Sequence, residues 1–336
     1  MSRFAGIAVL ILCALAISPR WAFGASTRPA QGAAQEVAAY PSRPIRFIIP
    51  APPGGTTGIL GRLVGQRLTD VLNQPVVVDH RGGAGGVVAA EITAKAAPDG
   101  YTLLVAYHSH TTNATLNPKV PYRPVDDYRP ITQATRAGLV LVVNLQMPVK
   151  TVQELIAYGK ANPGKLNFSS AGNGSGGHMA GELLKQMTGI QAQHVPYKGT
   201  GPSLIDVAGG QIEMSFAGMV PVQPLIRSGR VRALAVTTTE RIPSIPDLPT
   251  VAESGVPGFE VVGWYGFLAP AGVPQPIVAK LHAEIVKILR DPELTKRLTN
   301  DGAEVVASTP DEFEKFLRAD VVKWAKVVKA SGARLD

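Results

Sequence analysis

The chain has 336 residues, of which 45% are hydrophobic and 17% charged, and its formal net charge is +8. This length exceeds one typical domain and suits two, and the apolar fraction is sufficient for real cores. Nucleic-acid binding favours a clustered basic face with interleaved aromatic residues, whereas here the basic residues are scattered and only 6% of residues are aromatic. We therefore expect a protein that does not bind nucleic acid.

Residues 1–24 have the pattern of a secretory signal peptide. A basic start is followed by the uncharged apolar run Phe4–Ile17, and the small residues Ala22 and Gly24 suit a signal peptidase. A membrane anchor is the alternative, but this run is shorter than the ~20 residues of a spanning helix. We expect cleavage after Gly24, a flexible leader over residues 25–39, and a soluble periplasmic protein.

Cysteine usage agrees with export. The single cysteine, Cys13, lies inside the predicted signal peptide, so the mature chain has none. Its stability then needs no particular redox state, which suits an oxidising compartment.

From Pro44 onward, short β-rich runs alternate with amphipathic helices. The spacing of apolar residues predicts a helix over Thr57–Leu72, and Thr151 with Glu154 forms a capping box before another helix. We expect strands at Ile45–Ile49, Val76–Val78, Leu103–Ala106, Leu139–Asn144, Leu166–Ser169, Gln193–Val195, Glu213–Ala217, Ala233–Thr237 and Val262–Leu268. Further helices are expected at Gly86–Ala96, Thr151–Ala161, His178–Met187, Pro202–Ala208, Pro221–Ser228, Ile277–Arg290, Glu293–Asn300 and Asp311–Lys329.

This alternation predicts an α/β fold with two mostly parallel sheets and helices on both faces. The apolar strands Leu139–Asn144 and Val262–Leu268 bracket an autonomous block. We therefore expect one domain from residues 40–140 with 262–336 and a second domain from residues 141–261. Two crossovers between the domains make a hinge around a central cleft, which is typical of binding proteins.

Ligands of open parallel sheets bind beyond the carboxyl ends of the strands, so the strand-to-helix loops are the candidates. The first loop (residues 50–57) offers glycines, threonine hydroxyls and free N–H groups that attract anions, although alone it also fits an ordinary turn. The third loop (residues 169–178) contains G-x-G-x-x-G at Gly172, Gly174 and Gly177. It lacks the acid expected about 20 residues on in a dinucleotide site, which leaves a pocket wall rich in hydroxyl and N–H groups.

Two further loops join a strand to a helix. The second loop (residues 81–86) is glycine-rich, and close helix–strand packing is its better interpretation. The fourth loop (residues 196–203) contains Tyr197 and Lys198. That lysine is the one cation we single out in these loops, and a solvated surface position explains it equally well.

Histidines suggest a metal site only weakly. His108 and His110 share a face if their segment is extended, and His178 would complete a trio. No nearby acid or cysteine completes a usual ligand set, so we expect no metal and assign them as hydrogen-bonding cleft residues. The remaining histidines are expected to be structural: His80, His194 and His282.

Taken together, the loops resemble one family, the Bug-type periplasmic solute receptors of tripartite tricarboxylate transporters. The matching segments, each weak alone, run in the expected order from about Tyr40 to the C-terminus. They are Pro52–Gly55, Asn73–Val78, Gly82–Gly86, Ala97–Leu104, Ser170–Ser175, His194–Gly199, Leu248–Glu253 and Leu268–Gly272.

The resemblance implies a type II-like periplasmic binding protein whose two α/β domains close on a small organic carboxylate. Loop N–H groups, hydroxyls and ordered water hold the carboxylate, and membrane permease subunits are the partners of a monomeric receptor. Carried over residue by residue, the ligand-binding positions are Gly54, Gly55, Thr56, Ser170, Asn173, Ser175, His178 and Asp206. The loop analysis adds Thr57, His108, Ser109 and Tyr197.

The sequence departs from the family pattern at two places that concern the ligand. Gly58 and the pair Ala217-Gly218 stand where the family commonly has acidic or amide side chains, and an ammonium group buried without such a partner is costly. The segment Tyr107–Thr112 is bulkier than the common version and includes two histidines. We expect a dicarboxylate or aromatic acid without a free ammonium group.

Two other functions are compatible with the same fold. A ligand-binding sensor module for a signalling partner has no distinguishing sequence feature. A secreted α/β hydrolase needs a nucleophile, a base and an orienting group, and only Ser175 with His178 is close enough in sequence, without a nucleophile-elbow motif. We expect a receptor with no catalytic residue and no cofactor.

Overall fold

The computed structural model of the protein describes residues 39–53, 56–117, 119–300 and 302–331. The predicted signal peptide, with Gly54 and Gly55 of the first loop, lies outside the described residues. Short apolar runs form the strands: every residue of β1 (Ile45–Ile49) is buried except the half-buried Arg46. A continuous buried run of this kind indicates a strand covered on both faces.

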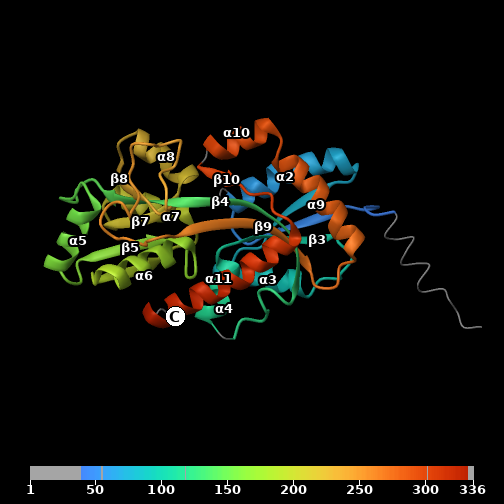
Figure 1. Ribbon diagram of the computed structural model, residues 1–336, viewed down its shortest axis with the longest axis horizontal. Helices are drawn as coiled ribbons and strands as arrows, with labels where there is room; N and C mark the ends of the chain where they lie inside the picture. The colour runs from blue at the N-terminus through green and yellow to red at the C-terminus, as the bar shows by residue number, and fades with distance from the viewer. Residues whose placement is uncertain (1–38, 54–55, 118, 301, 332–336) are drawn as a thin grey trace, which may run out of the picture. The chain divides into compact units, whose positions relative to one another are not determined.

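Within the described residues, ten strands form one mixed sheet (Figure 1). Along the main path the order is β2-β1-β3-β9-β4-β7-β5-β6, and β8 and β10 each pair with β4. The other strands are β2 (Val76–His80), β3 (Thr102–Tyr107), β4 (Tyr128–Asn144), β5 (Leu166–Ser170), β6 (Ala192–Pro196), β7 (Met214–Gly218), β8 (Val231–Val236), β9 (Val262–Pro270) and β10 (Ala303–Val305).

Strand β4 joins two halves of this sheet. Its residues Tyr128–Gly138 pair antiparallel with β9, and Leu139–Asn144 continue into pairs with β7 and β8. We call the strands β1, β2, β3, β9 and β10 with their helices the first half, and β5 to β8 with theirs the second half. Residues 40–336 nevertheless form one compact unit, and the division into two domains stays a prediction.

Helices connect the parallel strands of each half, as the alternating pattern predicts. In the first half, β1 pairs parallel with β2 and β3; in the second, β5 pairs parallel with β6 and β7. The helical elements are α2 (Thr56–Leu72), η1 (Ala84–Gly86), α3 (Val87–Ala94), α4 (Ser109–Leu116), α5 (Val152–Ala161), α6 (Gly176–Thr188), α7 (Thr200–Gly209), α8 (Met219–Arg227), α9 (Gln275–Leu289), α10 (Pro292–Asn300) and α11 (Pro310–Ser331).

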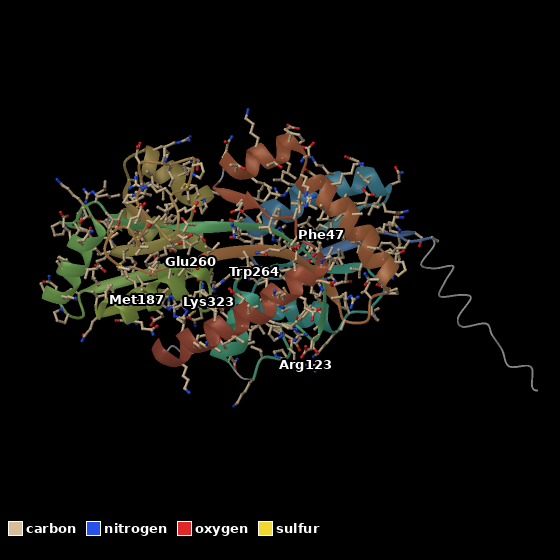
Figure 2. All side chains as sticks on the ribbon, viewed as in Figure 1. Phe47, Arg123, Met187, Glu260, Trp264 and Lys323 are labelled. Atoms are coloured by element: carbon tan, nitrogen blue, oxygen red, sulfur yellow. The ribbon has the colours of Figure 1, made fainter. Side chains whose placement is uncertain are left out.

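The C-terminal helix α11 crosses from the first half to the second. It packs against α4 and β4 and also against α6 of the second half (Figure 1). Asp320 is its buried anchor, because its carboxylate accepts hydrogen bonds from the Trp264 and Trp324 indole nitrogens at 3.0 and 2.9 Å. Figure 2 shows Trp264 beside α11 near the middle of the sheet. A buried carboxylate satisfied by several donors fixes the position of the helix that carries it.

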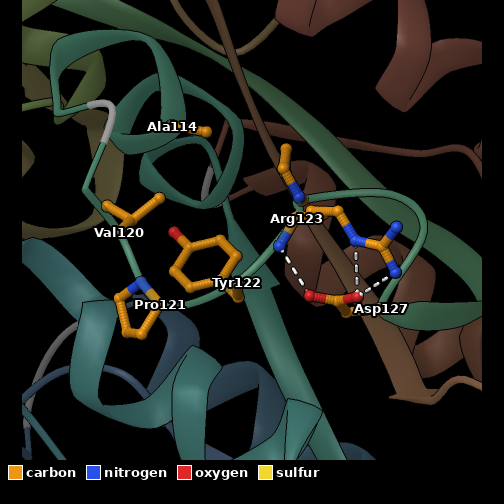
Figure 3. A pocket seen from close by; sticks show the side chains of 7 residues that line it. Ala114, Val120, Pro121, Tyr122, Arg123 and Asp127 are labelled. Carbon is orange, nitrogen blue, oxygen red and sulfur yellow. Dashed lines mark hydrogen bonds and ion pairs between the residues drawn. The ribbon is translucent and has the colours of Figure 1, made fainter.

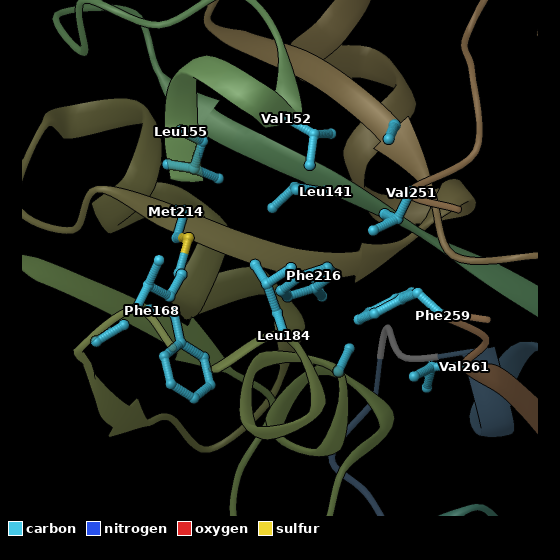
Figure 4. Close-up of a cluster of buried hydrophobic side chains, with 14 of the residues drawn as sticks. Leu141, Val152, Leu155, Phe168, Leu184, Met214, Phe216, Val251, Phe259 and Val261 are labelled. Carbon is cyan, nitrogen blue, oxygen red and sulfur yellow. The ribbon is translucent and has the colours of Figure 1, made fainter. Parts of the chain in front are cut away.

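The apolar core of the second half joins strands, helices and α11. Phe168, Met214 and Phe216 come from neighbouring strands and pack against Leu184 of α6 (Figure 4). Trp324 of α11 belongs to the same cluster and is 1% exposed. Burying one such large side chain contributes about 1.5–3 kcal/mol, so this cluster holds the C-terminal part of α11 on the second half.

Three findings differ from the sequence predictions. The sheet is mixed, because the long strands β4 and β9 add antiparallel pairs to the parallel units. Strand β4 begins at Tyr128 rather than Leu139, since polar residues such as Thr132 and Gln133 interrupt its apolar pattern. The residues after Tyr107 form the helix α4 and not an extended segment.

None of the helices in the described part of the chain is long and apolar enough to cross a membrane.

The helix predicted over Gly86–Ala96 is divided into η1 and α3. Gly85 and Gly86 have φ values of +64° and +98°, which a regular helix does not contain.

Candidate functional site

The candidate site lies where strands end and helices begin. Helices α2 and α4 begin directly after β1 and β3, and α6 begins after β5. At the start of α2, Thr57 is buried, and Thr56 lies close enough to Tyr265 of β9 to oppose the rise that burial causes in the pKa of that tyrosine. Helix N-termini present free N–H groups to a ligand, so the first and third loops are suited to anions.

Helix α4 brings loops from both halves together. Thr112 Oγ1 donates a hydrogen bond of 2.5 Å to the main-chain oxygen of Gly174 in the third loop. The next residue, Asn113, donates from Nδ2 to the main-chain oxygen of Gly85 in the second loop at 3.0 Å. Tyr107 at the end of β3 also donates to Gly85, at 2.9 Å. An extended segment, as predicted from the sequence, would not place Thr112 and Asn113 in these bridging positions.

Glycine is required where these loops approach one another. A Cβ on Gly174 would lie 2.5 Å from Asn113 Oδ1, and a Cβ on Gly85 would lie 2.9 Å from the main-chain oxygen of Asn173. Both glycines have positive φ, +72° and +64°, which disfavours other residues. The predicted site residue Asn173 is half-buried at this contact.

Ser175 and Ser170 shape the third loop from within. Ser175 is the N-cap of α6, where its Oγ accepts a hydrogen bond from the His178 main-chain nitrogen at 3.3 Å. Ser170 Oγ accepts from the Gly172 main-chain nitrogen at 3.1 Å and lies 2.7 Å from His194 Nε2. Both serines therefore stabilise the loop that presents its N–H groups.

The two histidines at the start of α4 do not share a face. His108 is buried and its ring packs edge-on against Trp324, with centroids 4.7 Å apart. His110 instead stacks on Tyr122 at 5.2 Å, and its Nε2 lies 2.8 Å from the Pro124 main-chain oxygen. The interpretation of an extended segment was wrong, because two residues along a helix point in different directions.

Burial lowers the pKa of both histidines. For His110 it lowers the pKa to about 4, despite the hydrogen bond to Pro124. For His108 burial is also the main cause, and the nearby Asp320 carboxylate opposes it. Both rings are therefore neutral near pH 7. Within the described ranges, no three histidine, cysteine or acidic side chains form a group that could hold a metal ion.

The remaining predicted positions lie on the fourth loop and α7. The Tyr197 hydroxyl donates to Asp206 Oδ2, and burial, followed by Asp206, raises the pKa of Tyr197 to about 12. Ser109 is fully buried at the start of α4, whereas Lys198 is exposed. The exposed lysine agrees with its interpretation as a solvated surface residue.

The three histidines expected to be structural each have a protein partner. His80 Nδ1 lies 2.8 Å from the Ala51 main-chain oxygen, and His282 Nε2 lies 3.1 Å from that of Ser308. His194 contacts Ser170 as described above. His80 and His194 thus support the first and third loops, respectively.

Two hollows flank α4. An open pocket of about 450 Å³ lies against the segment that leads from α4 to β4, where Arg123 binds Asp127 (Figure 3). It contains none of the predicted site residues. A cavity of about 10 Å³ lies among Pro50, Gly85, Tyr107 and His110, which is about the volume that one water requires.

Comparison with known proteins identifies the family. The model of the tripartite tricarboxylate transporter family receptor, TctC, matches residues 60–333. The chain belongs to this receptor family. Protein BugT of Bordetella pertussis is 38% identical over 298 residues, which cover 88% of this chain and 91% of BugT.

Solved structures agree in fold with the receptor. Rpa4515 of R. palustris with adipate is 36% identical, with a TM-score of 0.84, and the match covers 88% of this chain and 100% of that one. MatC of Rhodopseudomonas palustris with bound malate is 35% identical, with a TM-score of 0.81, and covers 86% and 100%. The predicted resemblance and the α/β binding-protein fold are confirmed.

Membership also fixes the general role of the receptor. The family consists of solute-binding receptors and not of enzymes, and its members are periplasmic.

Proposed function

We propose that this receptor binds a small organic carboxylate between the first and third loops and delivers it to the permease subunits of a tripartite transporter. The observation that carries this proposal is the bridge made by α4. Thr112 and Asn113 hydrogen-bond to Gly174 and Gly85, so glycine-rich loops from both halves meet at one helix. A ligand bound there would contact both halves at once.

The chemistry of these loops suits a carboxylate. Helices α2, α4 and α6 begin at the loops with Thr56, Ser109 and Gly176, and free N–H groups at helix N-termini favour anions. Threonine and serine hydroxyls add neutral donors. A carboxylate held by several such donors remains ionised without a cationic clamp.

We propose further that the ligand is a dicarboxylate or an aromatic acid without an ammonium group. A side chain at Gly58 would place its Cβ 2.9 Å from His80 Cε1, so the His80 ring occupies the space that an acid at position 58 would need. The Asp206 carboxylate already accepts from the Tyr197 hydroxyl. The dicarboxylates adipate and malate in the two related structures support this ligand class.

Export is part of the proposal. We propose that residues 1–24 are a signal peptide and that the mature chain begins near Ala25. N-terminal sequencing of periplasmic protein should give this start. Recovery of an intact Met1 from that fraction would contradict it.

A thermal-shift screen of carboxylates on the mature protein, followed by calorimetry, tests the binding function. Ser175→Ala removes the hydroxyl proposed to contact the carboxylate as well as the cap of α6, and loss of a hydrogen bond to the charged ligand should cost about 10- to 100-fold in affinity. Thr151→Ala is the matched control, because Thr151 caps α5 by the same type of bond at 3.1 Å. If both variants bind the carboxylate with equal affinity, the third loop is not part of the binding site.

Matched ligand pairs test the ligand class. Succinate should bind more tightly than aspartate, because Gly58 and the pair Ala217-Gly218 offer an added ammonium group no side-chain acceptor, and Asp206 is the candidate partner that this comparison tests. Benzoate-type diacids belong in the same competition series. Tighter binding of aspartate would overturn this part of the proposal and make Asp206 the first residue to substitute.

A further inference from the structure

Two imidazole rings are stacked beneath the third loop. The ring centroids of His178 on α6 and His194 on β6 lie 3.9 Å apart, with an interplanar angle of 11°. His194 also packs on the Phe168 ring at 5.0 Å, and His178 is only 3% exposed. Face-to-face stacking at this distance suits neutral rings, because two imidazolium ions would repel each other.

Each ring holds one end of the loop. His194 Nε2 lies 2.7 Å from Ser170 Oγ, at the start of the loop. The Gly174 main-chain nitrogen donates to His178 Nδ1 at 3.1 Å, near its end. A nitrogen that accepts a hydrogen bond carries no proton, so His178 is neutral with its hydrogen on Nε2. Protonation at Nδ1 would replace this acceptor by a donor that faces the Gly174 N–H.

We infer that His178 and His194 are positioning residues that hold the third loop in its ligand-binding conformation only while both rings are neutral. Carboxylate affinity then falls as the pH decreases. The inference rests on the proposed function, because that function assigns the third loop to the ligand. The receptor is thus expected to bind its carboxylate ligand more weakly at acidic pH than at neutral pH.

Burial and the charged groups near the two rings determine which histidine can take up a proton. On α6, Lys185 and Glu182 form an ion pair at 2.8 Å, and Lys185 Nζ lies 5.9 Å from the Phe168 ring. From β5, Phe168 and Ser170 are uncharged. Burial, then His178 and Lys185, lower the pKa of His194 to about 3. His194 therefore stays neutral above pH 4, so loss of the acceptor that binds the Gly174 N–H requires protonation of His178.

A ligand-free measurement tests the pair directly. Nitrogen-15 NMR of the mature protein should show His178 as the Nε2–H tautomer at pH 7.5. On acidification, the His178 ring and the Gly174 amide should titrate together, and the Gly174 amide should lose its protection from exchange. A Gly174 amide that is unchanged while His178 titrates would overturn the inference.

Variants with adipate as the probe test the link to binding. In His178→Asn the Oδ1 atom takes the place of Nδ1 and accepts at every pH, whereas His178→Phe keeps a ring without an acceptor. Wild-type affinity should fall about 5- to 30-fold between pH 7.5 and 5.0. Whatever its affinity at pH 7.5, His178→Asn should show only the pH dependence that the titration of adipate produces, and it therefore measures that contribution. His178→Phe should bind weakly throughout.

The outcomes separate this inference from the proposed function. If His178→Asn and wild type show the same pH dependence, the positioning role is wrong. If adipate does not bind the wild type at any pH, that result counts against the proposed ligand class. The ligand-free titration of His178 and Gly174 then decides the inference alone.

Discussion

Thr112 in α4 donates its hydroxyl to the main-chain oxygen of Gly174, which ties a helix of the first half to a loop of the second. Both atoms are buried, at a distance of 2.5 Å. The following side chain, Asn113, binds Gly85 within the first half. Two consecutive residues of one short helix thus tie the third loop, which is proposed to bind the ligand, to the second loop of the first half.

Replacing Thr112 by valine should therefore lower the stability of the folded protein. Valine keeps the shape but leaves the buried Gly174 oxygen without this donor, at a cost of about 1–3 kcal/mol in the free energy of unfolding. Urea denaturation measures it. Thr115→Val is the matched control, because Thr115 donates only within α4, to Thr112, at 2.7 Å. Equal losses in the two variants would mean that the bridge contributes nothing specific.

Much of the fold was predictable because local patterns decide it. Capping by Thr151 and termination by Gly189 set the observed limits of α5 and α6. Strand β4 was only half predicted, since its first part contains buried polar residues that are satisfied by distant partners. Thr132, for example, donates to Ser308 across 176 residues of sequence, and no local pattern reveals such a partner.

The sequence predicted the loops of the candidate site, but it did not reveal the hydrogen bonds that their residues make. Ser170 and His178 were expected at the ligand, and the side chain of each accepts a hydrogen bond from a main-chain nitrogen of the third loop. Thr112 and Asn113 were overlooked because a short helix rich in threonine has no apolar period. A polar Thr-Thr-Asn run directly after a buried strand is the signal that would have identified them.

Asp320 should be essential for the position of α11. Its Oδ2 accepts from Thr111 at 2.6 Å and from Trp264, and its Oδ1 accepts from Trp324. In Asp320→Asn one acceptor becomes a donor that faces a donor, so the free energy of unfolding should fall by about 1–3 kcal/mol. Urea denaturation followed by tryptophan fluorescence reports this directly. Asp126→Asn is the exposed control and should change stability by less than about 0.5 kcal/mol.

Stability should fall in mild acid because of His110. Burial lowers its folded-state pKa to about 4, whereas an unfolded histidine has a pKa near 6.5. Between these values the unfolded chain binds more protons, so stability is lost as the pH decreases. From pH 7 to pH 5 the loss should reach about 2 kcal/mol.

The variant His110→Gln tests this assignment. Glutamine can still donate to the Pro124 oxygen, as His110 Nε2 does at 2.8 Å, but it does not titrate. Urea denaturation at pH 7, 6 and 5 should give a shallower dependence for the variant than for wild type. Parallel curves would show that His110 does not contribute to the acid sensitivity.

Gly174→Ala should lower the affinity for the ligand, whereas its effect on stability should resemble that of a control glycine. The residue has a φ of +72°, and the added Cβ would lie 2.5 Å from Asn113 Oδ1 and 3.0 Å from Thr112 Oγ1. Gly189→Ala provides a close control, because Gly189 has a φ of +73° and nothing within 4 Å of the added Cβ. The backbone cost, about 1–2 kcal/mol, is therefore shared by both variants.

The difference between the two variants isolates the contact of the third loop with α4. Gly189→Ala should bind the best carboxylate of the screen as tightly as wild type, since it lies at the far end of α6. In Gly174→Ala the Asn113 and Thr112 side chains that bind the loops must shift, and the affinity should fall about 10-fold or more, which corresponds to about 1.4 kcal/mol. Calorimetry at pH 7.5 measures both. If Gly174→Ala binds like Gly189→Ala, the close approach of these elements is not needed for the ligand, and the site lies elsewhere on the third loop.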